Sequence, residues 1–129
     1  MATALITEGI KISTLTQFQD LYSNANQLNY AFSYKIRIEN TSEFTVQLLR
    51  RHWYIYNANG SVTEVEGEGV IGQQPILEPG QVHEYVSGCN LPTSMGKMNG
   101  TYLMERLLDG KNFYVKIPDM HLVVPYLLN

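Results

Sequence analysis

The sequence of 129 residues has few of the features that usually narrow down a protein's function. Cys89 is its single cysteine, so no disulfide can form within the chain. Basic residues are scattered apart from Arg50-Arg51, and the net charge of -3 argues against nonspecific nucleic-acid binding. No apolar run reaches the roughly 18 residues that a membrane-spanning helix needs. Residues 1–5 also lack the basic start of a signal peptide. We therefore expect a cytoplasmic protein without direct membrane insertion and without nucleic acid as a partner.

The composition is that of one globular unit. Hydrophobic residues make up 44% of the chain and charged residues 16%, with no long polar tract. At 14.7 kDa, folding should bury roughly two-thirds of the surface that the unfolded chain exposes. We expect a single domain over residues 1–129 with one sizeable core.

Alternating apolar and polar residues predict strands. The alternation is clearest over residues 30–39 and weaker over residues 6–14, with a polar loop at residues 23–27 between these two stretches. Turn signals recur at short intervals, at Asn40-Thr41-Ser42, Asn59-Gly60, Pro79-Gly80, Asn99-Gly100 and Asp109-Gly110. Short strands between such turns are typical of an all-β sandwich or barrel.

The hairpin at Asn59-Gly60 has two plausible registers. A two-residue turn would place Trp53 opposite Glu66, whereas a three-residue loop with Gly60 in the left-handed region places Trp53 opposite Val65. The second register sorts the two faces cleanly, because it sets Arg50 against Glu68, His52 against Glu66 and Tyr54 against Glu64. We therefore predict the second register, with Trp53 in the core. Arg51 falls on the same face as Trp53, which indicates either that Arg51 sits where the strand leaves the sheet or that Leu48-Leu49 marks a bulge that resets the alternation.

The hairpin at Asp109-Gly110 favours a two-residue turn. That turn sets Met104 against Val115 and Tyr102 against Ile117 on one apolar face.

A glycine pattern matches the dinucleotide-binding fingerprint. Gly67, Gly69 and Gly72 have the spacing of a GxGxxG motif. The fingerprint needs a helix that opens at the glycines, so that the pyrophosphate lies on the positive end of that helix. Fewer than four residues separate Pro75 from the next turn at Pro79-Gly80, so no helix fits. The pattern without this context is weak support for a nucleotide site.

The order of several segments resembles the ApaG family. They are residues 30–39, 45–53 and 65–75, Pro79-Gly80, residues 85–88 and 96–102, Ile117-Pro118 and Val124-Pro125. The resemblance implies a fibronectin type III or immunoglobulin-like β-sandwich of two antiparallel sheets. It also implies an association with cobalt resistance and magnesium efflux, through a bacterial member also called CorD, and a domain shared with F-box proteins. The glycine pattern has led to the suggestion that the family binds ligands containing pyrophosphate.

The glycine segment is the first candidate site. Gly67, Gly69 and Gly72 could form a nest of backbone N–H groups for an anion, with Arg50 and Arg51 nearby. The neighbouring glutamates would repel a phosphate unless Mg²⁺ or the arginines intervened. We favour the alternative that the glycines permit positive φ values, a bulge or a sharp crossing between the sheets.

A metal site is a weaker candidate. In the predicted register His52 shares a face with Glu66 and Glu68, which offers donors for Co²⁺ or, without the histidine, for Mg²⁺. A solvated face with paired charges is the favoured interpretation, because no strong metal-ligand spacing is present. We therefore predict no cofactor.

These features together predict a non-enzymatic β-sandwich that recognises another protein, as yet unidentified. The alternative is a pyrophosphate-containing or nucleotide ligand, with or without Mg²⁺, at residues 67–72. An enzyme ranks third, because no nucleophile or general base constellation is present and no motif flanks Cys89. The apolar tail at residues 122–128 must pack on the domain, swap into a second copy in a homo-oligomer, or bind something else.

Overall fold

Two antiparallel sheets make up the protein over residues 2–128, the part of the chain that the computed structural model describes. The first sheet has the order β1 (Ala2–Thr7), β2 (Ile10–Phe18), β3 (Tyr30–Asn40) and β7 (Val82–Leu91). The second has the order β5 (Val62–Glu68), β4 (Val46–Asn57), β8 (Met95–Arg106) and β9 (Lys111–Val123). β6 (Ile76–Leu77) pairs with the stretch of β4 that β5 leaves free. The short 3₁₀ segments are η1 (Asp20–Tyr22), η2 (Ala25–Gln27) and η3 (Pro125–Leu128).

The predicted fold class, a fibronectin type III or immunoglobulin-like β-sandwich, is confirmed. Alternate residues of each strand point between the sheets, where burying their apolar surface stabilises the fold. Trp53 is 3% exposed and lies in this core, as predicted. No helix in the described range is long and apolar enough to cross a membrane.

The predicted single strand over residues 6–14 is wrong. The chain reverses at Glu8 and Gly9, whose φ values are 46° and 79°, and Thr7 then pairs with Ile10. Two positive φ values form the tight turn that suits a two-residue hairpin. The weak alternation hid this turn because apolar residues occur on both sides of it.

The predicted register of β4 and β5 is confirmed. Trp53 lies opposite Val65, and His52 lies opposite Glu66. Gly60 has a φ of 90° in the predicted three-residue loop. The pairing of β4 with β8 shifts between Leu48 and Arg50, so the suggested bulge exists. Because of this bulge, Leu48, Arg51 and Trp53 all face inward.

The predicted turn at Asn99-Gly100 is also wrong, because both residues lie inside β8. The register of β8 with β9 shifts between Met98 and Gly100, which marks a bulge. A Cβ on Gly100 would stand 2.0 Å from the carbonyl O of His52. This glycine therefore allows a close approach of β4 and β8 and does not reverse the chain.

The predicted register at Asp109-Gly110 is off by two residues. β8 and β9 are joined by the loop 107–110, so Tyr102 pairs with Val115 and Met104 with Phe113. A shift of two preserves the faces, and the predicted apolar face is therefore still buried.

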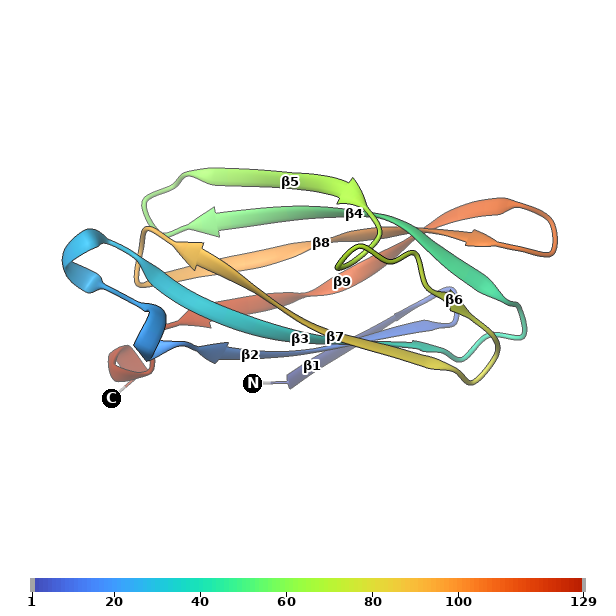
Figure 1. Ribbon diagram of the computed structural model, residues 1–129, viewed down its shortest axis with the longest axis horizontal. Helices are drawn as coiled ribbons and strands as arrows, with labels where there is room; N and C mark the ends of the chain where they lie inside the picture. The colour runs from blue at the N-terminus through green and yellow to red at the C-terminus, as the bar shows by residue number, and fades with distance from the viewer. Residues whose placement is uncertain (1, 129) are drawn as a thin grey trace.

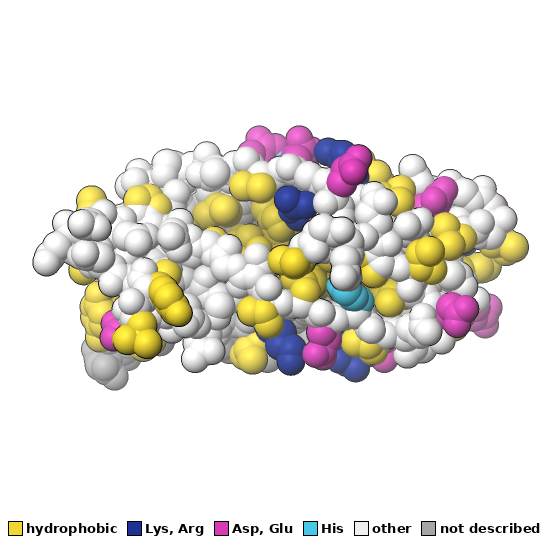
Figure 2. Space-filling view, viewed as in Figure 1, with side chains coloured by type: hydrophobic (Ala, Val, Ile, Leu, Met, Phe, Trp, Pro, Cys, Tyr) yellow, Lys and Arg dark blue, Asp and Glu magenta, His cyan; other side chains and the backbone are white. Residues whose placement is uncertain are grey.

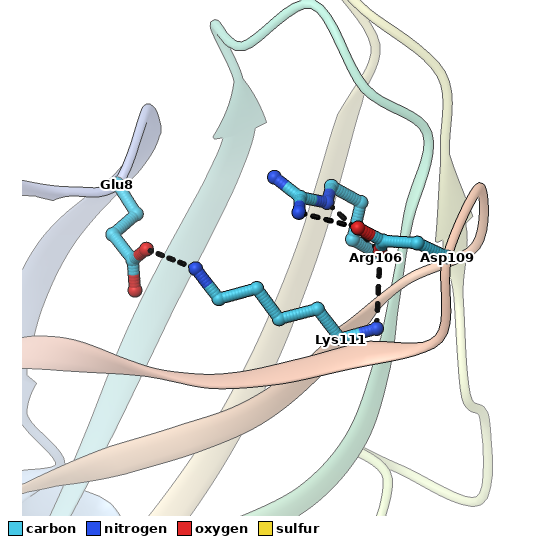
Figure 3. Close-up of polar contacts among 4 residues, drawn as sticks. All are labelled: Glu8, Arg106, Asp109 and Lys111. Carbon is cyan, nitrogen blue, oxygen red and sulfur yellow. Dashed lines mark hydrogen bonds and ion pairs between the residues drawn. The ribbon is translucent and has the colours of Figure 1, made fainter.

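Side-chain contacts explain the longer loop. Arg106 donates from Nε and Nη2 to the two carboxylate oxygens of Asp109, at 3.0 and 2.5 Å. The backbone N–H of Lys111 donates to Asp109 Oδ1 at 3.1 Å, and Lys111 Nζ lies 3.7 Å from Glu8 (Figure 3). A two-residue turn at Asp109-Gly110 would break this arrangement.

One side of the sandwich is closed and the other is open. β1 and β2 pack against β9 on the closed side. On the other side lie the edge strands β7 and β5, and the segment after β5 passes between them (Figure 1). The open side positions the candidate site.

We expect Asp109→Asn to lower stability at neutral pH, by an amount that shrinks in acid. The hydrogen bonds from Arg106 and from the Lys111 N–H lower the pKa of Asp109 from 3.8 to about 2. A lowered folded pKa contributes stability that is present above the unfolded pKa and is lost as the pH falls through the folded value. Urea unfolding of both proteins at about pH 7, about pH 4 and about pH 2 tests this. A constant difference between them would contradict it.

Candidate functional site

The segment after β5 forms a tight turn. Val70 N donates to Gln73 O at 2.8 Å, and Gln73 N donates to Val70 O at 3.0 Å. Ile71 and Gly72 between them have φ values of 48° and 71°. Positive φ at both central residues is the type I′ geometry of a two-residue hairpin turn. The glycine segment therefore turns the chain at the sheet edge and opens no helix.

Two of the backbone N–H groups that an anion nest would need, those of Gly69 and Val70, are used inside the protein. Gly69 N donates to the carbonyl O of Leu49 at 2.9 Å, and Gln74 Nε2 donates to the same oxygen at 2.9 Å. The N–H of Val70 is already bonded to Gln73. Gly69 has a φ of 61°, and a Cβ there would stand 2.1 Å from Gln73 O. Conformation and close contact account for glycine at this position.

Arg51 ties β4 to this turn. Its Nη1 donates to the carbonyl oxygens of Glu68 at 2.9 Å and Gly69 at 3.0 Å. The guanidinium lies over Gly67, where a Cβ would stand 2.7 Å from Nη2. The structure thus brings together Arg51, Gly67, Gly69 and Gly72 among the predicted site residues.

Arg51 also borders a cavity of about 180 Å³ between the sheets, which we call the Arg51 cavity. Its other lining residues are Tyr34, Trp53, Val70, Ile71, Gly72, Tyr85 and Ser87. The open side is visibly hollowed, with hydrophobic side chains at the bottom of the hollow (Figure 2). Pockets for small-molecule ligands are usually about 300–1,000 Å³. The Arg51 cavity is therefore the size for one side chain or a small anion.

Three tyrosines surround the charge of Arg51. Burial raises the pKa of Tyr34, Tyr85 and Tyr102, and the nearby guanidinium lowers each pKa by less. The hydroxyl groups of Tyr85 and Tyr102 are hydrogen-bonded to each other. All three stay protonated at physiological pH, so they can donate hydrogen bonds but cannot neutralise Arg51.

β7 runs beside this cavity as the end strand of its sheet, and in the part of the chain that the structure describes it pairs only with β3. Tyr85 and Ser87 face the cavity, whereas Val86 lies on the outer face of the sheet and is 62% exposed. A second concavity of about 660 Å³, the outer hollow, adjoins that face. It is lined by Gln19, Tyr22, Ala31, Phe32, Ser33, Val86, Gly88 and Asn90. The free edge of β7 therefore has one concavity on each face.

The remaining predicted residues lie on the opposite face of the second sheet. His52 contacts Glu64 through Nε2 at 2.6 Å and Glu66 through Nδ1 at 3.0 Å. The two carboxylates bind different ring nitrogens, so they do not converge on one point. Arg50 lies opposite Glu68 in the register, away from the Arg51 cavity. Within residues 2–128, no three His, Cys, Asp or Glu side chains are grouped to hold a metal ion.

Cys89 offers no activated nucleophile. Burial raises the pKa of its thiol to about 11, so the thiol is protonated at neutral pH.

Sequence reasoning missed the tyrosines and Ser87 at the open side. One signal was available in β7, where the inward positions His83, Tyr85, Ser87 and Cys89 are mostly polar. A strand with polar residues on both faces is typical of a sheet edge near an opening and not of a closed core.

Comparisons with known proteins agree over most of the chain. A family model described as the ApaG domain matches residues 20–106. Protein ApaG of Methylocella silvestris is 44% identical over 123 residues, which are 94% of this chain and 92% of the relative. Protein ApaG of Brucella canis is 42% identical over 120 residues, or 93% and 92% of the two chains. A crystal structure of a Bordetella pertussis protein described as ApaA has a TM-score of 0.86 at 40% identity, over 90% of this chain and 94% of that one.

We expect Gly69→Ala to destabilise the protein more than Gly72→Ala does. Both positions have positive φ, which costs a residue with a Cβ about 1–2 kcal/mol. At Gly69 the added Cβ also overlaps Gln73 O, whereas at Gly72 nothing lies within 4 Å. Urea unfolding measures both free energies of unfolding. Gly80→Ala is the matched control, because Gly80 has a φ of 86° in another turn and open space around it. Equal losses at Gly69 and Gly72 would contradict this account.

Proposed function

The chain belongs to the ApaG family, and we propose that it is a non-enzymatic module that recognises another protein through the open side of its sandwich. The free edge of β7 is the observation that supports this most directly. An unpaired edge offers a row of backbone N–H and C=O groups to which an extended segment of a partner can add as a further strand.

The other edges are better protected against such pairing. β1 and β9 pack against each other at the closed side. β5 carries glutamate at alternate positions, namely Glu64, Glu66 and Glu68. β7 has neither lysine nor proline, the usual guards of an edge strand, and its one charged side chain, Glu84, is ion-paired with Lys35 at 3.3 Å. With ten residues, β7 is long for an edge strand that lacks lysine and proline.

The concavities beside β7 suit an added strand. Side chains of a strand alternate between the two faces of the sheet. A segment paired with β7 would place every second side chain toward the Arg51 cavity and the others toward the outer hollow. Recognition by strand addition takes affinity from backbone hydrogen bonds and specificity from such pockets.

Ile71 at the border of the cavity supports the same function. This side chain is 61% exposed, and its φ of 48° is unfavourable for a β-branched residue. Strain and an exposed apolar side chain both cost stability, and such features often persist at binding sites.

The alternative of a pyrophosphate or nucleotide ligand has less support. The N–H groups of Gly69 and Val70 are bonded within the protein, Arg50 and Arg51 lie on opposite faces, and the cavity is small for a nucleotide. An enzymatic role has less support as well, because the Cys89 thiol and the tyrosines near Arg51 stay protonated and are not activated nucleophiles.

We also place the protein in the cytoplasm and connect it with cobalt resistance and magnesium efflux through a partner. No cluster of metal-ligating side chains occurs within residues 2–128, which favours an indirect connection over direct binding of the cation. The cation would then act on the partner or on its transport system, and the sandwich would only recognise that partner.

We expect Val86→Lys to abolish capture of the partner while leaving the fold intact. Val86 is 62% exposed on β7, and a lysine on an edge strand discourages pairing with a further strand. Affinity capture from cells, quantified by mass spectrometry, compares this variant with wild type.

Val62→Lys is the matched control, because Val62 is a 55% exposed valine on the other edge strand, β5. Proteins retained by wild type and by Val62→Lys but lost from Val86→Lys support the proposal. Equal retention by all three would contradict it.

We expect Co²⁺ and Mg²⁺ to leave the melting temperature of the isolated protein unchanged. We expect the same for the His52→Gln variant. The physical reason is that Glu64 and Glu66 occupy different nitrogens of the His52 ring. Calorimetric and thermal titrations with both ions check this. A saturable stabilisation that disappears in His52→Gln would show that His52 forms a metal site after all.

A further inference from the structure

Arg51 has hydrogen-bonding capacity that the protein does not use. Nη1 is held by the carbonyl oxygens of Glu68 and Gly69. Within residues 2–128, neither Nε nor Nη2 has an acceptor and no carboxylate is ion-paired with Arg51. Nε and Nη2 form the edge of the guanidinium that binds a carboxylate with two parallel hydrogen bonds.

The surroundings leave this charge without a partner. The titratable side chains that face it are Tyr34, Tyr85 and Tyr102, all of them neutral. Glu64 and Glu66 contact His52 on the opposite face of the sheet. A positive group in a cavity that excludes part of the water favours an anionic occupant.

The arrangement of β5 and β7 indicates from which direction an anionic group would enter the Arg51 cavity. Arg51 lies over Gly67 of β5, while Tyr85 and Ser87 bring β7 to the same cavity. Val65 faces inward on β5 yet is 39% exposed, so β5 overhangs the space beside β7. An inward side chain of a strand added to β7 would enter this space.

Resting on the function proposed above, we infer that the partner is an extended segment with an acidic side chain that binds Arg51, flanked on both sides by apolar side chains. The acidic residue is Asp or Glu at an inward position. Its two neighbours point to the other face, where Val86 and Tyr22, 62% and 73% exposed, border the outer hollow. The recognised pattern is therefore apolar–acidic–apolar.

A second copy of the chain would satisfy this pattern poorly. If two β7 strands paired, their inward side chains would be His83, Tyr85, Ser87 and Cys89, none of which is a carboxylate. Glu84 lies on the outer face and is already paired with Lys35. Charge complementarity at Arg51 thus favours a different chain.

Selection from a displayed library of random peptides on the wild-type protein tests the inference. We expect the selected peptides to share an acidic residue between two apolar ones. For the strongest binder, a synthetic version with that residue changed from Glu to Gln, or from Asp to Asn, should bind roughly 10- to 100-fold more weakly, since a hydrogen-bonded charge is lost. This comparison uses the wild-type protein, so no protein variant has to fold.

A double-mutant cycle then assigns the effect to Arg51. In Arg51→Gln the acidic and amide peptides should bind alike. Arg50→Gln is the matched control, because the neighbouring arginine lies on the opposite face and should keep the full preference. Thermal unfolding of each variant checks that it is folded.

The outcomes separate this inference from the proposed function. Peptides that lose binding to Val86→Lys but do not distinguish Glu from Gln would overturn the acidic preference and keep strand addition to β7. Peptides that bind Val86→Lys as well as wild type would overturn both. Dimerisation of the protein alone, abolished by Val86→Lys, would make a second copy the occupant and overturn the inference.

Discussion

The bulge in β4 at Leu49 is the constraint on which the candidate site depends. Leu48 and Arg51 are an odd number of residues apart, so a regular strand would put them on opposite faces. The register shift between Leu48 and Arg50 adds the residue that brings both to the inner face. Without it, either Leu48 or Trp53 would leave the core, at a cost of about 1.5–3 kcal/mol for a buried side chain of this kind. Core packing therefore maintains the bulge, and the bulge turns Arg51 inward.

An inward Arg51 in turn explains the glycine pattern. The guanidinium occupies the place where a Cβ of Gly67 would stand, and it binds the carbonyl oxygens just before the turn. Gly69 then permits the close approach of Gln73, and Gly72 completes the type I′ turn. Each glycine thus has a separate steric reason. A spacing that resembles a phosphate-binding loop arises here from one arginine and one tight turn.

The sequence predicted the features that depend on local alternation and cross-strand charge. The register of β4 and β5 followed from Trp53, Val65 and the facing pairs, because a slip of one residue would have reversed every face. The turn at Glu8-Gly9 was missed because apolar residues occur on both sides of it. At residues 107–110 the reversal was predicted with the wrong length, since glycine and aspartate signals fix a reversal but not its length. The Arg51 cavity could not be predicted, because β3, β4 and β7 approach there only through the topology of the two sheets.

Several features of the open side oppose stability and occur together. Among the described residues no carboxylate is ion-paired with Arg51, which is partly withdrawn from water. Ile71 is exposed at a positive φ, and β7 ends its sheet without a lysine or a proline. Single substitutions would relieve some of them, such as an asparagine in place of Ile71 in the turn or a lysine on the edge strand β7. Local rules of folding are usually broken at functional sites and compensated elsewhere. The closed side, where β1 and β2 pack on β9, lies away from these features, so the proposed binding face and the closed side are separate parts of the sandwich.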